Sequence, residues 1–260
     1  MQKPKRILLS IDFDYFFKEN PLWDFGHAET SYFCTTAWDI RYKTGKINLI
    51  EETDPKRFAD FQPKAWFEEI LKKFKFNISQ NCQAWTNASH AGIVPAVEMT
   101  KLEFDVLVNY DAHHDFFGDP EQKQVHCGNW GWKLKERNPD LRAFWIVPKW
   151  LKEFHTDETL ADDVPEFVRV QTHKDFEFNA PAEVVGIFFA RSDPWVPPHH
   201  DPAFNDMVGG VSQKLCIPPR AIWPNEKERI KFNEDLHAKL NCPKRKANLN
   251  MIRAHAKTLK

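Results

Sequence analysis

The amino-acid sequence predicts an α/β fold with a mostly parallel sheet. Apolar segments rich in β-branched and aromatic residues recur along the chain, most clearly at 6–11, 104–108 and 183–190. Segments with helical periodicity lie between them, at 63–76 and 91–101. No internal repeat or linker-like segment divides the 260 residues, so we expect one domain over 1–260.

The composition argues against several classes of partner. The formal net charge is −1, which gives no reason to expect a nucleic-acid or membrane surface over the whole protein. No apolar run is long enough to span a bilayer. The five cysteines are scattered without a CxxC pair, which is typical of reduced thiols and predicts a cytoplasmic location. The oligomeric state is left open.

The rest of the chain carries weaker patterns. We expect strands at 141–147 and 166–172 and helices beginning near 125–130, at 204–209 and at 226–239. The irregular, aromatic segment 18–55 is either a flap over a site or a surface insertion. Residues 240–260 form a basic C-terminal tail, which is either solvated or a docking site for an acidic partner.

The central motif follows the strand at 104–108. Asp111, His113 and Asp115 stand at positions i, i+2 and i+4, which point the same way if the chain is extended. Parallel sheets bind ligands at the carboxyl ends of their strands. Two carboxylates and an imidazole suit a divalent ion such as manganese. The alternative is a polar turn after a strand.

A second strand end repeats this arrangement. The strand at 6–11 runs into Asp12 and Asp14, again at i and i+2. Two carboxylates in a dry sheet edge are costly without a cation, so a shared metal site is favoured over an exposed pair. His90 begins a helical segment shortly before the central motif. It is a metal ligand, a neighbour of a helix cap, or a core histidine.

Further polar residues are candidates for catalysis or substrate binding. His126 precedes a predicted helix and is a candidate general acid, because histidine titrates nearest neutrality; the alternative is a solvent-facing histidine. Asp193 and Asp201 lie in the Pro-stiffened loop after the strand at 183–190, on the expected ligand edge, although Asp193 is equally placed to cap a helix. Asn129 is a further candidate substrate contact.

These motifs resemble those of the ureohydrolases, the arginase and agmatinase superfamily. Asp111 to Asp115 match its Asp-Ala-His-x-Asp motif, and Ser10 to Asp14 match its Ser-x-Asp-x-Asp motif. The resemblance implies a three-layer αβα arginase-like fold and two Mn²⁺ ions per chain. It implies six metal ligands: Asp12 and Asp111 as bridges, His90 and Asp115 on one ion, and Asp14 and His113 on the other.

Two departures qualify the resemblance. The Ser-x-Asp-x-Asp strand comes first here, which implies a rearranged strand order. The Ser-Gly-Asn-x-His pattern that holds a free amino acid in arginases is not recognisable after Asp115. A closer likeness is to a branch that contains the peptide arginases of ribosomal-peptide (RiPP) biosynthesis, matched at 12–16, at Asn129-Trp130 and at 145–150.

The resemblance predicts a hydrolase that converts arginine side chains of a precursor peptide to ornithine and urea. A metal-held hydroxide would attack the guanidinium carbon, with Asp115 orienting it and His126 protonating the leaving amine. Asp193 or Asp201 would pair with the guanidinium. The alternatives are a ureohydrolase acting on arginine or agmatine, a single-zinc deacetylase, and a non-catalytic binding module.

Overall fold

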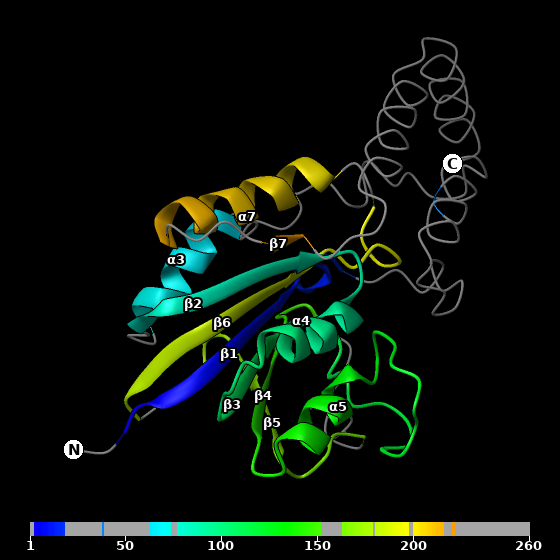
Figure 1. Cartoon of the computed structure of the whole chain (residues 1–260). Coiled ribbons are helices and arrows are strands. Elements are labelled where there is room, and N and C mark those ends of the chain that lie inside the picture. The colour runs from blue at the N-terminus through cyan, green and yellow to red at the C-terminus, as the bar shows by residue number, and fades with distance from the viewer. Residues whose placement is uncertain are drawn as a thin grey trace, which may run out of the picture.

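A seven-stranded parallel sheet forms the centre of the molecule, as the computed structural model shows (Figure 1). The structure describes residues 3–18, 38, 63–73, 77–151, 163–178, 180–197, 200–215 and 220–221. The strand order is β5-β4-β3-β1-β6-β2-β7. The strands are β1 (Lys5–Asp12), β2 (Asn77–Asn87), β3 (Val106–Tyr110), β4 (Arg142–Val147), β5 (Val168–Thr172), β6 (Ala182–Ala190) and β7 (Arg220–Ala221).

Helices cover both faces of the sheet (Figure 1). The helices α3 (Pro63–Lys73) and α7 (Asp201–Leu215) pack on one face, and α4 (Ile93–Thr100) and α5 (Trp130–Arg137) pack on the other. Two short 3₁₀ helices, η1 (Phe13–Phe16) and η4 (His90–Gly92), follow β1 and β2. This arrangement confirms the predicted three-layer α/β fold.

The central strands are apolar because both of their faces are buried. In β1, Ile7, Leu9 and Ile11 pack toward α3 and α7, whereas Leu8 packs toward α4 and α5. Each of these four side chains is fully buried. An apolar run without polar alternation is therefore what such a strand requires, and it is the pattern by which 6–11, 104–108 and 183–190 were predicted.

The strand order reverses direction between β1 and β3. These two strands are neighbours, but the chain leaves β1 toward β2 on one side and leaves β3 toward β4 on the other. At such a reversal, the loops that follow the two strands run to opposite sides. In open α/β sheets, ligands bind at this point, at the carboxyl ends of the strands. The two predicted metal-binding motifs follow these two strands.

The sequence did not predict β2. This strand has the sequence NISQNCQAWTN and is half-buried, with both faces partly polar in its first half. Its pairing with β6 is irregular between Ile78 and Gln83. It carries neither the apolar run nor the strict alternation by which strands are recognised.

Several predictions concern segments outside the described residues. Of the proposed flap, 18–55, the structure describes only residues 18 and 38, and the predicted helix at 226–239 and the tail at 240–260 lie outside it. None of the described helices has the length and apolar character needed to cross a bilayer.

Candidate metal centre

Asp12 and Asp14 are brought together by a turn and not by an extended strand. The strand β1 ends at Asp12, and η1 begins at the next residue. Asp12 Oδ1 accepts a hydrogen bond from the backbone N–H of Asp14 at 3.0 Å and so caps this helix. The predicted extended alternation is therefore wrong here, and local capping is the physical reason.

The same correction applies to the central motif. The strand β3 ends at Tyr110, and the chain then bends. Asp111 Oδ1 accepts the backbone N–H of His113 at 2.8 Å, and Asp115 has a left-handed backbone with φ of 61°. A non-glycine residue in this conformation costs energy and is found mostly at functional sites. The three side chains meet because the loop folds back on itself.

His90 reaches the centre from η4, which the Ser89 hydroxyl caps through the N–H of Ala91. Its ring stacks on Phe188 of β6, with an interplanar angle of 3°. Three carboxylate oxygens surround its Nδ1: Asp12 Oδ2 at 3.0 Å, Asp111 Oδ2 at 2.9 Å and Asp115 Oδ2 at 2.9 Å. His90 thus contacts carboxylates from both strand ends.

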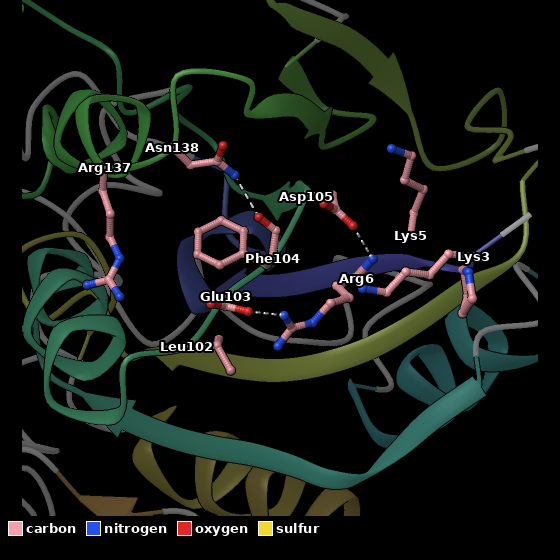
Figure 2. Close-up of a pocket in the computed structure, with 10 residues that line it drawn as sticks. Lys3, Lys5, Arg6, Leu102, Glu103, Phe104, Asp105, Arg137 and Asn138 are labelled. Carbon is pink, nitrogen blue, oxygen red and sulfur yellow. Dashed lines mark hydrogen bonds and ion pairs between the residues drawn. The ribbon is translucent and has the colours of Figure 1, made fainter.

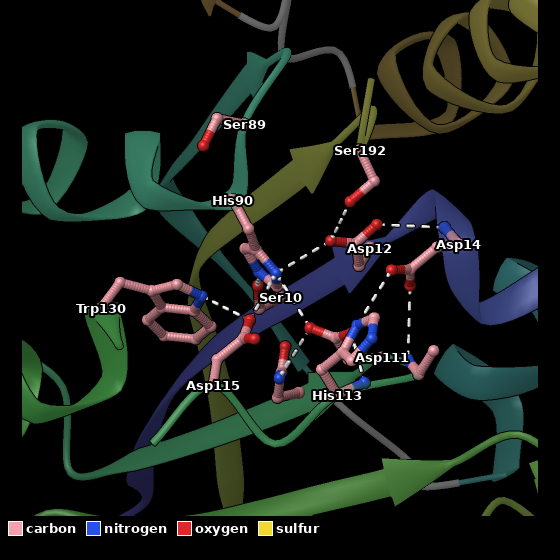
Figure 3. A network of polar contacts seen from close by, with 12 residues as sticks. Ser10, Asp12, Asp14, Ser89, His90, Asp111, His113, Asp115, Trp130 and Ser192 are labelled. Carbon is pink, nitrogen blue, oxygen red and sulfur yellow. Dashed lines mark hydrogen bonds and ion pairs between the residues drawn. The ribbon is translucent and has the colours of Figure 1, made fainter. Parts of the chain in front are cut away.

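The acidic and imidazole groups form two adjacent sets of ligand atoms (Figure 3). One set is Asp12, His90 and Asp111, and the other is Asp14, Asp111 and His113. His113 Nδ1 lies 3.3 Å from Asp14 Oδ2 and 3.6 Å from Asp111 Oδ1. Asp111 belongs to both sets, and either set could hold a metal ion.

Burial makes the charges of these groups interdependent. Burial and the carboxylates of Asp12 and Asp111 raise the pKa of Asp14 well above the usual value for an aspartate. Burial and the Asp111 carboxylate raise the pKa of Asp115 in the same way. Burial also acts to raise the pKa of Asp111, but the neighbouring imidazoles of His113 and His90 hold it well below the usual range.

For the imidazole of His90, burial and the neighbouring carboxylates shift the pKa in opposite directions. Burial alone disfavours its charged form, but the surrounding carboxylates of Asp111, Asp115 and Asp12 raise its pKa well above the usual value. In the protein alone, the centre therefore holds protons in places where a cation would otherwise neutralise the carboxylates.

Two observations fit a metal ion. His90 Nδ1 and Asp14 Oδ2 are buried without an aligned hydrogen bond, although oxygens or nitrogens lie close to both. In a six-coordinate shell with metal–oxygen distances of about 2.1 Å, neighbouring ligand atoms lie about 3.0 Å apart. The spacing around His90 Nδ1 matches this value, so Asp12, His90 and Asp111 could hold a shared ion.

Four residues that support the ligands were not predicted as site residues. Ser192 donates its hydroxyl to Asp12 Oδ2 at 2.5 Å, and the Trp130 indole donates to Asp115 Oδ2 at 2.5 Å. Asn109 donates its amide to Asp111 Oδ2 at 3.1 Å, and Ser10 Oγ lies 2.6 Å from His90 Nε2. Ser10 and Trp130 belong to the motifs that resemble those of the ureohydrolases, and this resemblance was the one signal in the sequence that could have identified them as site residues.

His126 and Asn129 hold the loop before α5 together. Asn129 accepts the backbone N–H of His126 at 2.8 Å and donates to the carbonyl of Gln124 at 2.9 Å. His126 Nδ1 accepts the backbone N–H of Gly128 at 3.1 Å. The side chain of Asn129 is buried, and its oxygen and its nitrogen each make one of these contacts within the loop.

The two acidic candidates after β6 differ in their surroundings. Asp201 Oδ1 accepts the guanidinium of Arg191, whose Nε lies 2.6 Å away, so this carboxylate already pairs with an internal cation. The backbone of Asp193 bonds to two segments, its N–H to the carbonyl of Ala88 and its carbonyl to the Trp38 indole. The Trp38 contact places one residue of the segment 18–55 against the loop beside the metal centre.

A cavity of about 450 Å³ lies at the opposite, amino edge of the sheet (Figure 2). Both of its carboxylates contact Arg6, Glu103 through the guanidinium at 2.7 Å and Asp105 through the backbone N–H at 2.9 Å. It contains none of the candidate catalytic or metal-binding residues.

No protein-family model matches this chain, and neither does any curated protein or solved structure. The likeness to ureohydrolases thus rests on the motifs in the sequence and remains a prediction.

Proposed function

We propose that this protein is a metal-dependent hydrolase that converts arginine side chains of a peptide to ornithine and releases urea. The observation that carries the proposal is the pair of ligand sets that share Asp111 at the carboxyl ends of β1 and β3, where the strand order reverses. Two-metal sites with a shared carboxylate are suited to adding water to a carbon bound to electronegative atoms. The motifs that supply these ligands resemble those of ureohydrolases.

The donor set favours two manganese ions. Asp12, His90 and Asp111 would hold one ion, with Asp115 beside His90, and Asp14, His113 and Asp111 would hold the other. Carboxylate and imidazole donors suit manganese, and four ionised aspartates balance the charge of two divalent cations. Such ions, when bound, would lower the pKa of a water molecule enough to make it a nucleophile near neutral pH.

Asp115 and His126 are the residues that we assign to proton handling. The Trp130 indole fixes Asp115 Oδ2 beside His90, so the position of this carboxylate is set before substrate arrives. His126 Nδ1 accepts a backbone N–H, so Nε2 is the ring nitrogen left for a substrate. As the imidazolium, with the bond from Gly128 given up, His126 would deliver a proton from Nε2 to the leaving amine and return to the neutral form.

Asp193 is our candidate partner for the substrate guanidinium. Of the two acidic residues predicted for this role, Asp201 already binds Arg191, and a second guanidinium would have to displace that pair. Asp193 stands next to Ser192, which contacts the metal ligand Asp12. A cation that leaves water requires such a carboxylate.

Mass spectrometry would test the proposal directly. The manganese-loaded protein is incubated separately with an arginine-containing peptide, with free arginine and with agmatine. We expect the peptide to lose CH₂N₂ and an equal amount of urea to appear. The Asp111→Asn variant should do neither, because it removes the carboxylate that both ligand sets share.

Other results would contradict parts of the proposal. Turnover of arginine or agmatine alone would replace the peptide by a small guanidino compound as substrate. No urea from any of the three, with metal shown to be bound, would reject the ureohydrolase assignment.

A further inference from the structure

The metal centre is accessible from one side. The side chain of His113 is 24% exposed, whereas the side chains of the other five proposed ligands are at most 5% exposed. Four of those five, Asp12, Asp14, Asp111 and His90, belong to the end of β1 and to the segments that directly follow β1, β2 and β3. A substrate group that approaches the ions must therefore pass beside His113.

Trp195 stands at this opening. Its ring lies against the His113 imidazole, with centroids 5.1 Å apart and an interplanar angle of 44°. It is half-buried and packs with its inner part on the core beneath α3 and α7. An indole in this place forms part of the wall that any substrate side chain meets.

Hydrogen bonds from a buried side chain stabilise the loop that carries Trp195. The guanidinium of Arg191, fully buried, donates to the carbonyls of Val196 at 3.2 Å and Pro197 at 2.9 Å, and it pairs with Asp201. These bonds tie both ends of the segment 191–197 to the start of α7. Trp195 is thus presented on a preformed turn.

The same loop is bonded to the metal centre and to the segment that contains Trp38. Ser192, with a left-handed φ of 52°, donates its hydroxyl to Asp12, and the Trp38 indole donates to the carbonyl of Asp193 at 2.6 Å. The backbone strain at Ser192 is the kind that persists where surrounding contacts enforce it. The position of Trp195 relative to the ligands is therefore well defined.

We propose that Trp195 is the specificity-determining residue of this site and selects a slender side chain that ends in a planar cation. An indole attracts a guanidinium through the negative charge of its ring face, and this attraction strengthens as water is excluded. A fixed ring beside the one accessible ligand also limits the width of what can enter. The choice of guanidinium rests on the proposed function, but the place of Trp195 at the opening does not.

Binding measurements can isolate the role of Trp195. The manganese-loaded protein is titrated calorimetrically with the N-acetyl methylamide of arginine and with that of citrulline, its neutral isostere. We expect the wild type to prefer the arginine compound. In Trp195→Leu this preference should fall about tenfold, whereas Trp195→Phe should keep most of it because a ring remains.

Two controls accompany these variants. Phe178→Leu removes another half-buried ring from the same core, just before the amino end of β6, and should leave the preference unchanged. Metal content and circular dichroism are measured for each variant, because Trp195 contacts a proposed ligand.

The outcomes separate this inference from the proposed function. An unchanged preference in Trp195→Leu, with metal and fold intact, would overturn the role of Trp195 whether or not urea is formed. Absence of urea in the wild type, together with a preference that depends on Trp195, would reject the reaction and retain the site as a cation-selective one.

Discussion

The two ring nitrogens of His90 have different partners. Nδ1 faces three carboxylate oxygens, whereas Nε2 lies 2.6 Å from Ser10 Oγ. A metal-binding Nδ1 requires the hydrogen on Nε2, and Ser10 Oγ is the acceptor placed for it. Ser10 therefore fixes the tautomer and the ring orientation that a metal ion needs.

Replacing Ser10 by alanine should weaken metal binding without unfolding the protein. We expect about a 10- to 100-fold loss of manganese affinity, the usual effect of removing a hydrogen-bond partner behind a histidine ligand. Competition with a chelator would measure it. Thr100→Ala, which removes a hydroxyl that bonds to the carbonyl of Ala96 at the end of α4, is the control. Equal affinities in the two variants would contradict the role of Ser10.

At the scale of elements, α5 and the central motif are in close contact at Gly131. A Cβ atom there would lie 2.6 Å from the Phe116 ring and 2.8 Å from the carbonyl oxygen of Asp115. The N–H of Gly131 also donates to that carbonyl at 3.0 Å. The helix thus supports the strained backbone of Asp115 directly, and only glycine allows this distance.

A pair of glycine variants tests the contact. Gly131→Ala should lower the free energy of unfolding by about 1–3 kcal/mol, the usual cost of overpacking, because the Asp115 carbonyl is backbone and cannot rotate away. Gly209→Ala, in α7, meets no atom within 4 Å and should raise it by about 0.5–1 kcal/mol. Denaturant titration would measure both. A stability loss in Gly209→Ala as large as in Gly131→Ala would refute the argument from contact.

At the scale of the whole molecule, protons would compete with metal ions for the candidate metal centre. The pKa values of Asp14, Asp115 and His90 are all raised in the protein without metal. Each of these groups thus binds its proton more tightly in the folded state than in the unfolded state. The contribution of the bound protons to the free energy of unfolding is therefore present at low pH and is lost as the pH rises through the raised pKa values. Metal binding displaces these protons and becomes more favourable over the same range.

The stabilisation by metal should therefore grow with pH. We expect addition of a chelator to lower the Tm of the manganese-loaded protein more at about pH 8 than at about pH 5, since a bound ligand stabilises by an amount that rises with its affinity. Thermal scans across this range would measure the difference. Asp14→Asn should show a smaller chelator effect at every pH, because it removes a proposed ligand together with one of the raised carboxylates. A chelator effect that is the same at every pH would count against the proposed metal centre.

The sequence predicted those parts of the fold and site that depend on local pattern. Strands such as 183–190 were predictable because burial on both faces requires an apolar run, and the aspartates were predictable because they follow such runs. The polar strand β2 shows neither signal. The Ser192–Asp12 bond joins residues 180 positions apart, and the Arg191–Asp201 pair depends on how the loop closes, so neither was accessible from the sequence.

The position of β6 in the sheet affects the order in which the candidate metal centre can form during synthesis on the ribosome. Asp12 and Asp14 are synthesised first, yet β1 lies between β3 and β6, and β6 ends only at Ala190. At about 5–20 residues per second, the nascent carboxylates wait roughly ten seconds or longer for their last neighbouring strand. Pairings this distant along the chain form slowly. Ser192, which follows β6, completes the surroundings of Asp12 still later. Capture of the proposed metal ions would therefore belong to the end of folding, and nascent chains that stop before β6 should hold them poorly.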